Sequence, residues 1–271
     1  MRGDDLNEST IDAALRGSFG RPIRFFASVA STNEVALHWA GRDAPHGALV
    51  VADYQSAGRG RWGRTWVAPR GRALLFSVIL RPTDPKNVSL VSTALGVAVA
   101  EGLEACASLD AKLRWPNDVM VDGRKIAGIL VETVSHGGAI DALVAGVGIN
   151  VATRAQDLPE ELRTTATSIA ELQGKAPLRA QVLAEMLDGI ERVMSALDVE
   201  GGREDVVARA TARSAVLGRE VVARFADGTT MAGTASRLTS TGTLEISVDG
   251  RATVLDSAEI VRMEAEDGEQ R

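Results

Sequence analysis

Apolar and polar positions along most of the chain follow the periods of both strands and helices. Short apolar runs predict strands at 24–29, 49–52, 74–80, 112–115, 119–121, 125–134 and 140–147. Asp122-Gly123, between two of these runs, is a strong hairpin signal. Helical periods predict helices at 88–106, 178–197 and 204–212. A further helix is expected from Ser31 to about Ala40, because Ser31 and Glu34 have the spacing of a capping box.

The pattern changes at Gly218, where strands become short and turns frequent. Runs at 220–225, 229–235, 243–248 and 253–255 are separated by Asp227-Gly228 and Asp249-Gly250, which predicts a small barrel. The expected fold class is therefore α+β: a large mixed β-sheet domain with flanking helices and a small C-terminal SH3-like β-barrel. We expect an N-terminal extension at 1–23, the large domain at 24–215, the small domain at 216–264 and a flexible tail at 265–271.

Composition narrows the class of protein. Hydrophobic residues make up 45% of the 271 and charged residues 24%, as in an ordinary globular protein. The single Cys106 excludes an internal disulfide, and three scattered histidines argue against a zinc enzyme. The net charge of −6 argues against nucleic-acid or membrane partners. The N-terminus has no signal peptide, and the apolar run at 88–100 is shorter than the roughly 20 residues of a membrane span. We expect a cytoplasmic protein.

Basic residues are concentrated in one segment. Six arginines and no acidic residue lie between Tyr54 and Thr83. A solvated basic loop is the alternative, but clustered arginines are the usual partners of phosphate and carboxylate groups. The segment predicts an anion site.

Glycines accompany these arginines. Gly58-x-Gly60-x-x-Gly63 matches a dinucleotide-binding fingerprint, which must open a helix and precede an acidic residue by about 20 positions. Here an extended segment follows, and the first downstream acid, Asp84, lies in a predicted turn, so this interpretation is excluded. The remaining pattern, three glycines alternating with Arg59, Arg61 and Arg64, predicts a loop that folds over a polyanion.

Five segments carry a resemblance to a known family. The segment 55–66 (QSAGRGRWGRTW) resembles the biotin-binding loop of biotin–protein ligases. Segments 114–118 (RWPND) and 124–132 (RKIAGILVE) are similar to that family's KWPND and RK[LI]AGIL[VA]E motifs. Ser31-Thr32-Asn33 and the GVGIN segment at 146–150 complete the pattern. The resemblance covers residues 24–263.

The resemblance implies a two-step ligase reaction. The biotin carboxylate attacks the α-phosphate of ATP and forms biotinyl-5′-AMP and pyrophosphate. A lysine of a biotin carboxyl carrier protein domain, part of a biotin-dependent carboxylase, then takes the biotinyl group. Bringing two anions together requires positive charge and alignment. ATP and Mg²⁺ are the implied cofactors, although no metal-ligand set is recognisable.

Site residues follow from the same resemblance, position by position. The residues expected to bind biotin are Ser31, Thr32, Asn33, Gln55, Gly58, Arg59, Gly60, Arg61, Lys125 and Gly128. The residues expected to bind ATP or the adenylate are Arg61, Arg64, Trp66, Asn117, Lys125 and Asn150. The residues expected to act in catalysis are Lys125, Asp118 and Arg61.

Several of these residues have simpler alternatives. Ser31 could serve only as a helix cap, and Trp66 could be a core aromatic at the start of a strand. Asp118 could orient the acceptor lysine, share Mg²⁺, or be a turn residue. Lys125 could be a solvent-facing strand lysine, but only four of the 30 basic residues are lysines, which favours a function for the one on the motif.

The chain departs from the family pattern in three ways. Arg114 replaces the usual lysine of KWPND, and Trp62 stands where relatives often have a basic residue. The N-terminal DNA-binding domain of bifunctional relatives is missing, so a monofunctional ligase is expected, as a monomer or weak homodimer. A lipoate–protein ligase and a nucleic-acid-binding regulator are the alternatives. The polar Ser31, Thr32 and Gln55 favour a ureido ring over the dithiolane of lipoate.

Overall fold

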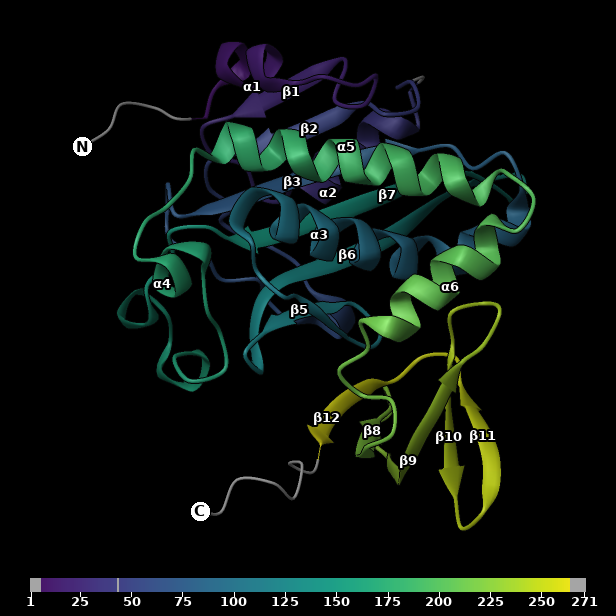
Figure 1. The fold of residues 1–271 in the computed structure, drawn as a ribbon. Coiled ribbons are helices and arrows are strands. Elements are labelled where there is room, and N and C mark those ends of the chain that lie inside the picture. The colour runs from purple at the N-terminus through teal and green to yellow at the C-terminus, as the bar shows by residue number, and fades with distance from the viewer. Residues whose placement is uncertain (1–5, 43, 264–271) are drawn as a thin grey trace.

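A computed structural model describes residues 6–42 and 44–263, and the tail predicted at 265–271 lies outside them. A seven-stranded sheet occupies the centre of the large unit, in the order β1-β2-β3-β7-β6-β5-β4 (Figure 1). Only β1 and β2 are parallel, so the sheet is mixed. Its strands are β1 (Ile23–Phe26), β2 (Leu49–Ala52), β3 (Ala73–Leu80), β4 (Lys112–Arg114), β5 (Asp118–Val121), β6 (Arg124–His136) and β7 (Ala139–Asn150).

Helices cover both faces of this sheet. Alternate residues of β3 divide between the two faces: Phe76 and Val78 pack with α3 and α5, and Ile79 packs under α2. All of β3 is buried, which explains why its sequence is apolar without alternation. The helices are α1 (Glu8–Ala14), α2 (Thr32–Ala40), α3 (Val91–Ala107), α4 (Ile169–Gln173), α5 (Arg179–Leu197) and α6 (Gly202–Ala212).

One helical segment in the described part of the chain, Pro85–Ala107, is long and apolar enough by length and composition to cross a membrane. In the fold, 72% of its most apolar window is buried. The segment packs against α5 and the sheet, and its composition is that of a core helix.

The C-terminal residues form a second, five-stranded antiparallel sheet in the order β11-β10-β9-β8-β12 (Figure 1). Trp115 joins the two sheets: its ring packs in the core of the small sheet, and its Nε1 donates to the carbonyl of Gly242 at 3.0 Å. The strands are β8 (Glu220–Arg224), β9 (Thr230–Leu238), β10 (Leu244–Val248), β11 (Arg251–Leu255) and β12 (Glu259–Met263).

The α+β class and the small all-β unit are confirmed. The predicted turns at Asp122-Gly123 and Asp249-Gly250 are also confirmed, and both residues of each turn have positive φ angles. Three local predictions need correction. The helix predicted from residue 88 begins with a 3₁₀ segment, Pro85–Leu90, and becomes α-helical only at Val91. Elements α1, α4 and β12 were not predicted. The capping box at Ser31 does not form, because the Ser31 side chain makes no cap hydrogen bond.

Candidate active site

A cavity of about 510 Å³ lies between the large sheet and β12. Its volume falls in the range of small-molecule sites. The segments that line it come from both sheets and from the glycine-arginine loop, residues 56–68. The predicted site residues on its wall are Ser31, Thr32, Asn33, Gln55, Arg59, Gly60, Arg61, Arg64, Trp66, Asn117, Asp118, Lys125, Gly128 and Asn150.

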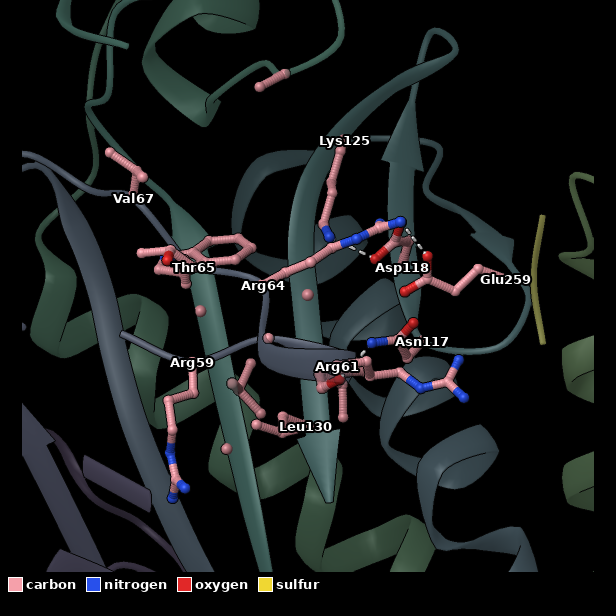
Figure 2. Close-up of a pocket in the computed structure, with 18 of the residues that line it drawn as sticks. Arg59, Arg61, Arg64, Thr65, Val67, Asn117, Asp118, Lys125, Leu130 and Glu259 are labelled. Atoms are coloured by element: carbon pink, nitrogen blue, oxygen red, sulfur yellow. Dashed lines mark hydrogen bonds and ion pairs between the residues drawn. The ribbon is translucent and has the colours of Figure 1, made fainter. Parts of the chain in front are cut away.

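The glycine-arginine loop folds back on itself and reaches the small sheet. Its turn closes where the amide of Gly60 donates to the carbonyl of Arg64 at 2.7 Å. From there, the Nη1 of Arg61 donates to the carbonyl of Ala258 at 2.9 Å. The guanidinium of Arg64 pairs with the carboxylate of Glu259 at 2.5 Å (Figure 2). The loop is therefore held over the cavity by residues next to and within β12.

A cluster of opposite charges lies beside this loop. The Asp118 carboxylate is 2.5 Å from the Nζ of Lys125 and 2.7 Å from the Nη2 of Arg114. Burial alone raises the pKa of Asp118, but the nearby charges of Lys125 and then Arg114 outweigh it and leave the pKa below its usual value. Asp118 is thus ionised at neutral pH and orients the Lys125 ammonium in the cavity.

Trp66 lies flat on two glycines of the sheet. A Cβ built on Gly128 would be 2.8 Å from the indole, and one on Gly148 would be 2.6 Å from it. The Lys125 Nζ is 5.4 Å from the centroid of the ring, within cation–π range. The buried indole Nε1 has no hydrogen-bond partner in the structure. Trp66 therefore belongs to the wall of the cavity, and it lies in the loop rather than at the start of a strand.

Neutral polar groups gather at another part of the wall. The Gln55 Oε1 accepts from the backbone N–H of Thr32 at 2.6 Å and lies 2.9 Å from the Thr32 hydroxyl. Gln55 thus satisfies the N–H of Thr32, the first residue of α2. Arg59 points away from the Lys125 cluster (Figure 2) and pairs with the carboxylate of Glu132 at 3.1 Å.

The lining residues of the cavity differ from the sequence prediction in two respects. Gly58 is not among the lining residues; a Cβ there would be 2.6 Å from the carbonyl of Trp66, so its role is to let the loop pack against itself. Arg224 and Glu259 line the cavity and were not predicted. Strand β12 carries Glu259, and its only signal is the short apolar pair Ile260-Val261 near the end of the chain.

Known proteins are similar to this chain in sequence and in fold. A sequence model of the biotin/lipoate A/B protein ligase family matches residues 25–150. The biotin–[acetyl-CoA-carboxylase] ligase of Mycobacterium tuberculosis is 33% identical to the chain over 253 residues, which cover 91% of each protein. The chain belongs to the biotin/lipoate A/B protein ligase family. It is similar to the biotin protein ligases within that family.

Two further ligases show how far the likeness extends. The bifunctional ligase/repressor BirA of Bacillus spizizenii is 38% identical over 184 residues. That match covers 67% of this chain but 57% of the relative, so the chain spans less than two thirds of that ligase. A solved structure of the biotin protein ligase from Aquifex aeolicus, in complex with biotin and ATP, has a TM-score of 0.78 and 30% identity. It covers 90% of this chain and 100% of the Aquifex chain, so both sheets of this family member have counterparts in that ligase.

Proposed function

We propose that this chain is an ATP-dependent biotin–[acetyl-CoA-carboxylase] ligase, which forms biotinyl-5′-AMP and transfers the biotinyl group to a lysine of a carrier domain. The observation that carries the proposal is the division of one cavity into a neutral polar part, around Thr32 and Gln55, and a cationic part, around Lys125 and Arg64. A neutral ureido ring suits the first part, and a carboxylate beside a triphosphate suits the second.

In the first step, the biotin carboxylate oxygen attacks the α-phosphorus of ATP, and pyrophosphate leaves with the electron pair of the broken P–O bond. Lys125 supplies a compact positive charge where the two anions meet, and Asp118 fixes its position. Arg61 and Arg64 hold phosphate oxygens, which requires Arg64 to exchange Glu259 for the nucleotide. Trp66 and Asn150 face the adenine, and Asn117 fixes the wall beside them by donating to the carbonyl of Ile129 at 2.7 Å.

The remaining predicted residues surround the biotin head. Ser31, Thr32 and Gln55 bind the ureido ring, and Arg59 closes that end of the cavity. The others shape the backbone around the ligand: Asn33, Gly58, Gly60 and Gly128. Because the indole of Trp66 lies on Gly128, this glycine is required for the shape of the cavity as well as for ligand approach.

In the second step, the carrier lysine amine attacks the carbonyl of the mixed anhydride, and AMP leaves. That lysine is mostly protonated near neutral pH and must first lose a proton. Asp118, on the cavity wall beside Lys125, is a carboxylate that can attract the ammonium. Since Asp118 already pairs with Arg114 and Lys125 and has a lowered pKa, it acts by orienting the amine more than by taking its proton.

Mg²⁺ fits this site as a companion of the nucleotide. Among the described residues, no three His, Cys, Asp or Glu side chains lie close enough together to hold a metal ion. Mg²⁺ usually binds one or two carboxylates together with substrate phosphates and water. When bound, the ion supplies further positive charge to the triphosphate. Within residues 6–42 and 44–263, Asp118 and Glu259 are the carboxylates on the cavity wall that can reach it.

Two further points complete the proposal. We place the reaction in the cytoplasm, because the single Cys106 suits a reducing compartment. A monomer or weak homodimer is the expected assembly, since the cavity of one chain has all of the predicted site residues except Gly58 on its wall.

The deciding experiment is the exchange of labelled pyrophosphate into ATP, with biotin and lipoate as parallel substrates. Exchange with biotin alone supports the proposal, and exchange with lipoate alone assigns the chain to lipoate activation. Transfer is then tested by incubating the enzyme, biotin and ATP with an apo carrier domain and measuring its mass. An unmodified carrier, despite exchange with biotin, would contradict the second step.

A further inference from the structure

One carboxylate on the cavity wall is shared between two arginines. The Glu259 Oε2 is 2.5 Å from the Nη2 of Arg64 and 3.5 Å from the Nη2 of Arg224. The Glu259 side chain is 12% exposed, whereas the side chain of Arg64, which reaches it from the glycine-arginine loop, is 51% exposed (Figure 2). A buried carboxylate of the small sheet thus holds a solvent-facing arginine of the loop.

The two ion pairs are close but poorly aligned. Among the described residues, no group donates a hydrogen bond to the Glu259 Oε2, although this atom is buried. A buried carboxylate oxygen without a hydrogen bond is less stable than one that accepts well-directed N–H groups. Glu259 is therefore a weak partner for Arg64, and a ligand with better-placed oxygen atoms can replace it.

The two arginines differ in how firmly the fold holds them. Arg224 lies directly opposite Glu259 in the ladder between β8 and β12, and opposite Thr230 in the ladder between β8 and β9. Arg64 lies outside any strand, next to Gly63, whose φ is +74°. Because the sheet fixes Arg224 beside Glu259, this arginine remains when Arg64 moves away. The buried carboxylate is then not left without a cation, which would be costly.

The charges of the cavity wall favour an anion that competes with Glu259. In the part of the chain that the structure describes, two acidic side chains, Asp118 and Glu259, line the cavity together with six basic ones. The Asp118 carboxylate pairs with Lys125 and Arg114, and all three of these residues lie on strands. Glu259 instead pairs with the loop. A phosphate group between the loop and β12 offers Arg64 several oxygens in place of one carboxylate.

We propose that Glu259 is a positioning residue that competes with the nucleotide phosphates: it holds Arg64 in the ligand-free protein, and it pairs with Arg224 alone when a phosphate group takes Arg64. This inference rests on the proposed function, because the competing ligand is the triphosphate of ATP or the pyrophosphate released from it. Glu259 weakens the binding of every ligand whose phosphate binds Arg64. It thereby favours the release of pyrophosphate and does not affect the binding of the nucleoside.

The test compares ligands with and without phosphate. Calorimetry on the full chain measures the affinities for MgATP, pyrophosphate and adenosine in the wild-type protein and in Glu259→Gln. Because the Arg64 side chain is half exposed, its pair with Glu259 has the strength of a surface ion pair, so Glu259→Gln is expected to bind MgATP and pyrophosphate about threefold more tightly. Adenosine, which has no phosphate, is expected to bind equally to both proteins. Biotin-dependent pyrophosphate exchange is expected to show the same gain as a lower KM for ATP.

A matched ion pair in the same sheet provides the control. The Glu245 Oε2 on β10 is 2.7 Å from the Nη2 of Arg237, and the two side chains are 14% and 63% exposed, close to the values for Glu259 and Arg64. Neither Glu245 nor Arg237 lines the cavity. Glu245→Gln is therefore expected to leave all three affinities at their wild-type values.

Two further variants test the partner that remains and guard against a failure to fold. Arg224→Gln removes the second partner of Glu259, so Glu259 is expected to hold Arg64 more firmly and the affinity for MgATP to fall about threefold. In a protein that also carries Glu259→Gln, Arg224→Gln is expected to change this affinity less than about twofold. If Glu259→Gln does not fold, Glu259→Asp, whose carboxylate is one methylene farther from Arg64, is expected to bind MgATP about twofold more tightly than the wild type.

Each outcome decides the inference. Equal or weaker binding of MgATP and pyrophosphate by Glu259→Gln overturns it, and weaker binding is the result expected if Glu259 bound Mg²⁺ or only held the loop in place. A gain that adenosine or Glu245→Gln shares also overturns it, as does an Arg224→Gln effect that persists in the double variant. The proposed function fails separately: the expected affinities without biotin-dependent exchange would refute the ligase and support the competition. Protein that binds neither MgATP nor pyrophosphate overturns both.

Discussion

Gly148 is a position where one added methyl group should change the shape of the cavity. Its Cβ would be 2.6 Å from the Trp66 Cε2, 2.8 Å from Cζ2 and 2.9 Å from Nε1. Unstrained contacts between carbon atoms are about 3.5–4.0 Å, so Gly148→Ala must move the indole by roughly 1 Å. The ring cannot move closer to β6, because it already lies against Gly128. It must therefore move into the cavity.

The free-energy cost of Gly148→Ala depends on how easily the indole of Trp66 can move. Overpacking a well-packed contact costs about 1–3 kcal/mol. Trp66 lies in a loop, so the strain is expected to displace the ring more than to unfold the protein. If the binding free energy of ATP becomes less favourable by this amount, the affinity for ATP falls by about 5- to 150-fold. Pyrophosphate exchange at varied ATP concentration measures this as a rise in KM for ATP.

A second glycine provides a matched control. Gly96 is buried in α3, and its Cβ would be 3.4 Å from a methyl of Leu113, an ordinary contact. Gly96→Ala is expected to leave the KM for ATP and the melting temperature close to those of the wild type. A Gly148→Ala protein with the wild-type KM for ATP would refute the placement of Trp66 against the nucleotide. A large loss of stability in Gly148→Ala, with no change in KM for ATP, would refute the claim that the loop moves to relieve the strain.

Three further predictions concern charged residues. Lys125→Ala is expected to keep the fold and lose at least about 100-fold in biotin-dependent exchange, whereas Lys112→Ala on β4, two strands away, is expected to keep exchange. Equal rates for the two variants would contradict the role of Lys125. The pKa of Asp118 is lowered in the folded protein, so its ionised form contributes stability above the unfolded pKa of about 4 and loses it as pH falls through the folded pKa. The free energy of unfolding of Asp118→Asn is therefore expected to fall less steeply below pH of about 4, which urea titrations at several pH values measure. Arg179 is buried and pairs with Asp53 at 2.7 Å, so Arg179→Ala is expected to cost about 3–5 kcal/mol in urea unfolding, and a cost below about 1 kcal/mol would show that the pair is not needed.

Local sequence patterns were enough to predict several elements of the fold. The hairpin at Asp122-Gly123 follows from residues that accept positive φ, and β3 follows from eight consecutive apolar or small residues. Helix α5 follows from its helical period. In each case the chain segment itself carries the preference, and packing adds to it.

Other features depend on residues far away in the sequence. The start of α2 has the local pattern of a capping box, but the Ser31 side chain makes no cap hydrogen bond, and Gln55 from the loop after β2 accepts the N–H of Thr32. Arg61 and Arg64 were expected on one loop, and they lie there. Their partners lie far along the chain: Ala258, the partner of Arg61, is 197 positions later. No local pattern indicates such a contact, because neither Ala258 nor Glu259, both buried in the fold, belongs to a motif that marks a partner for the loop.

The cavity wall is complete only when the last strand is in place. Its first lining residue is Ser31 and its last is Val261, ten residues before the end of a 271-residue chain. During synthesis, the large sheet can therefore assemble while the glycine-arginine loop still lacks its attachment to Glu259. A growing chain on the ribosome has the walls of the site but no means of covering a reactive ligand. The order of the sequence thus delays the covered site until β12 has been made.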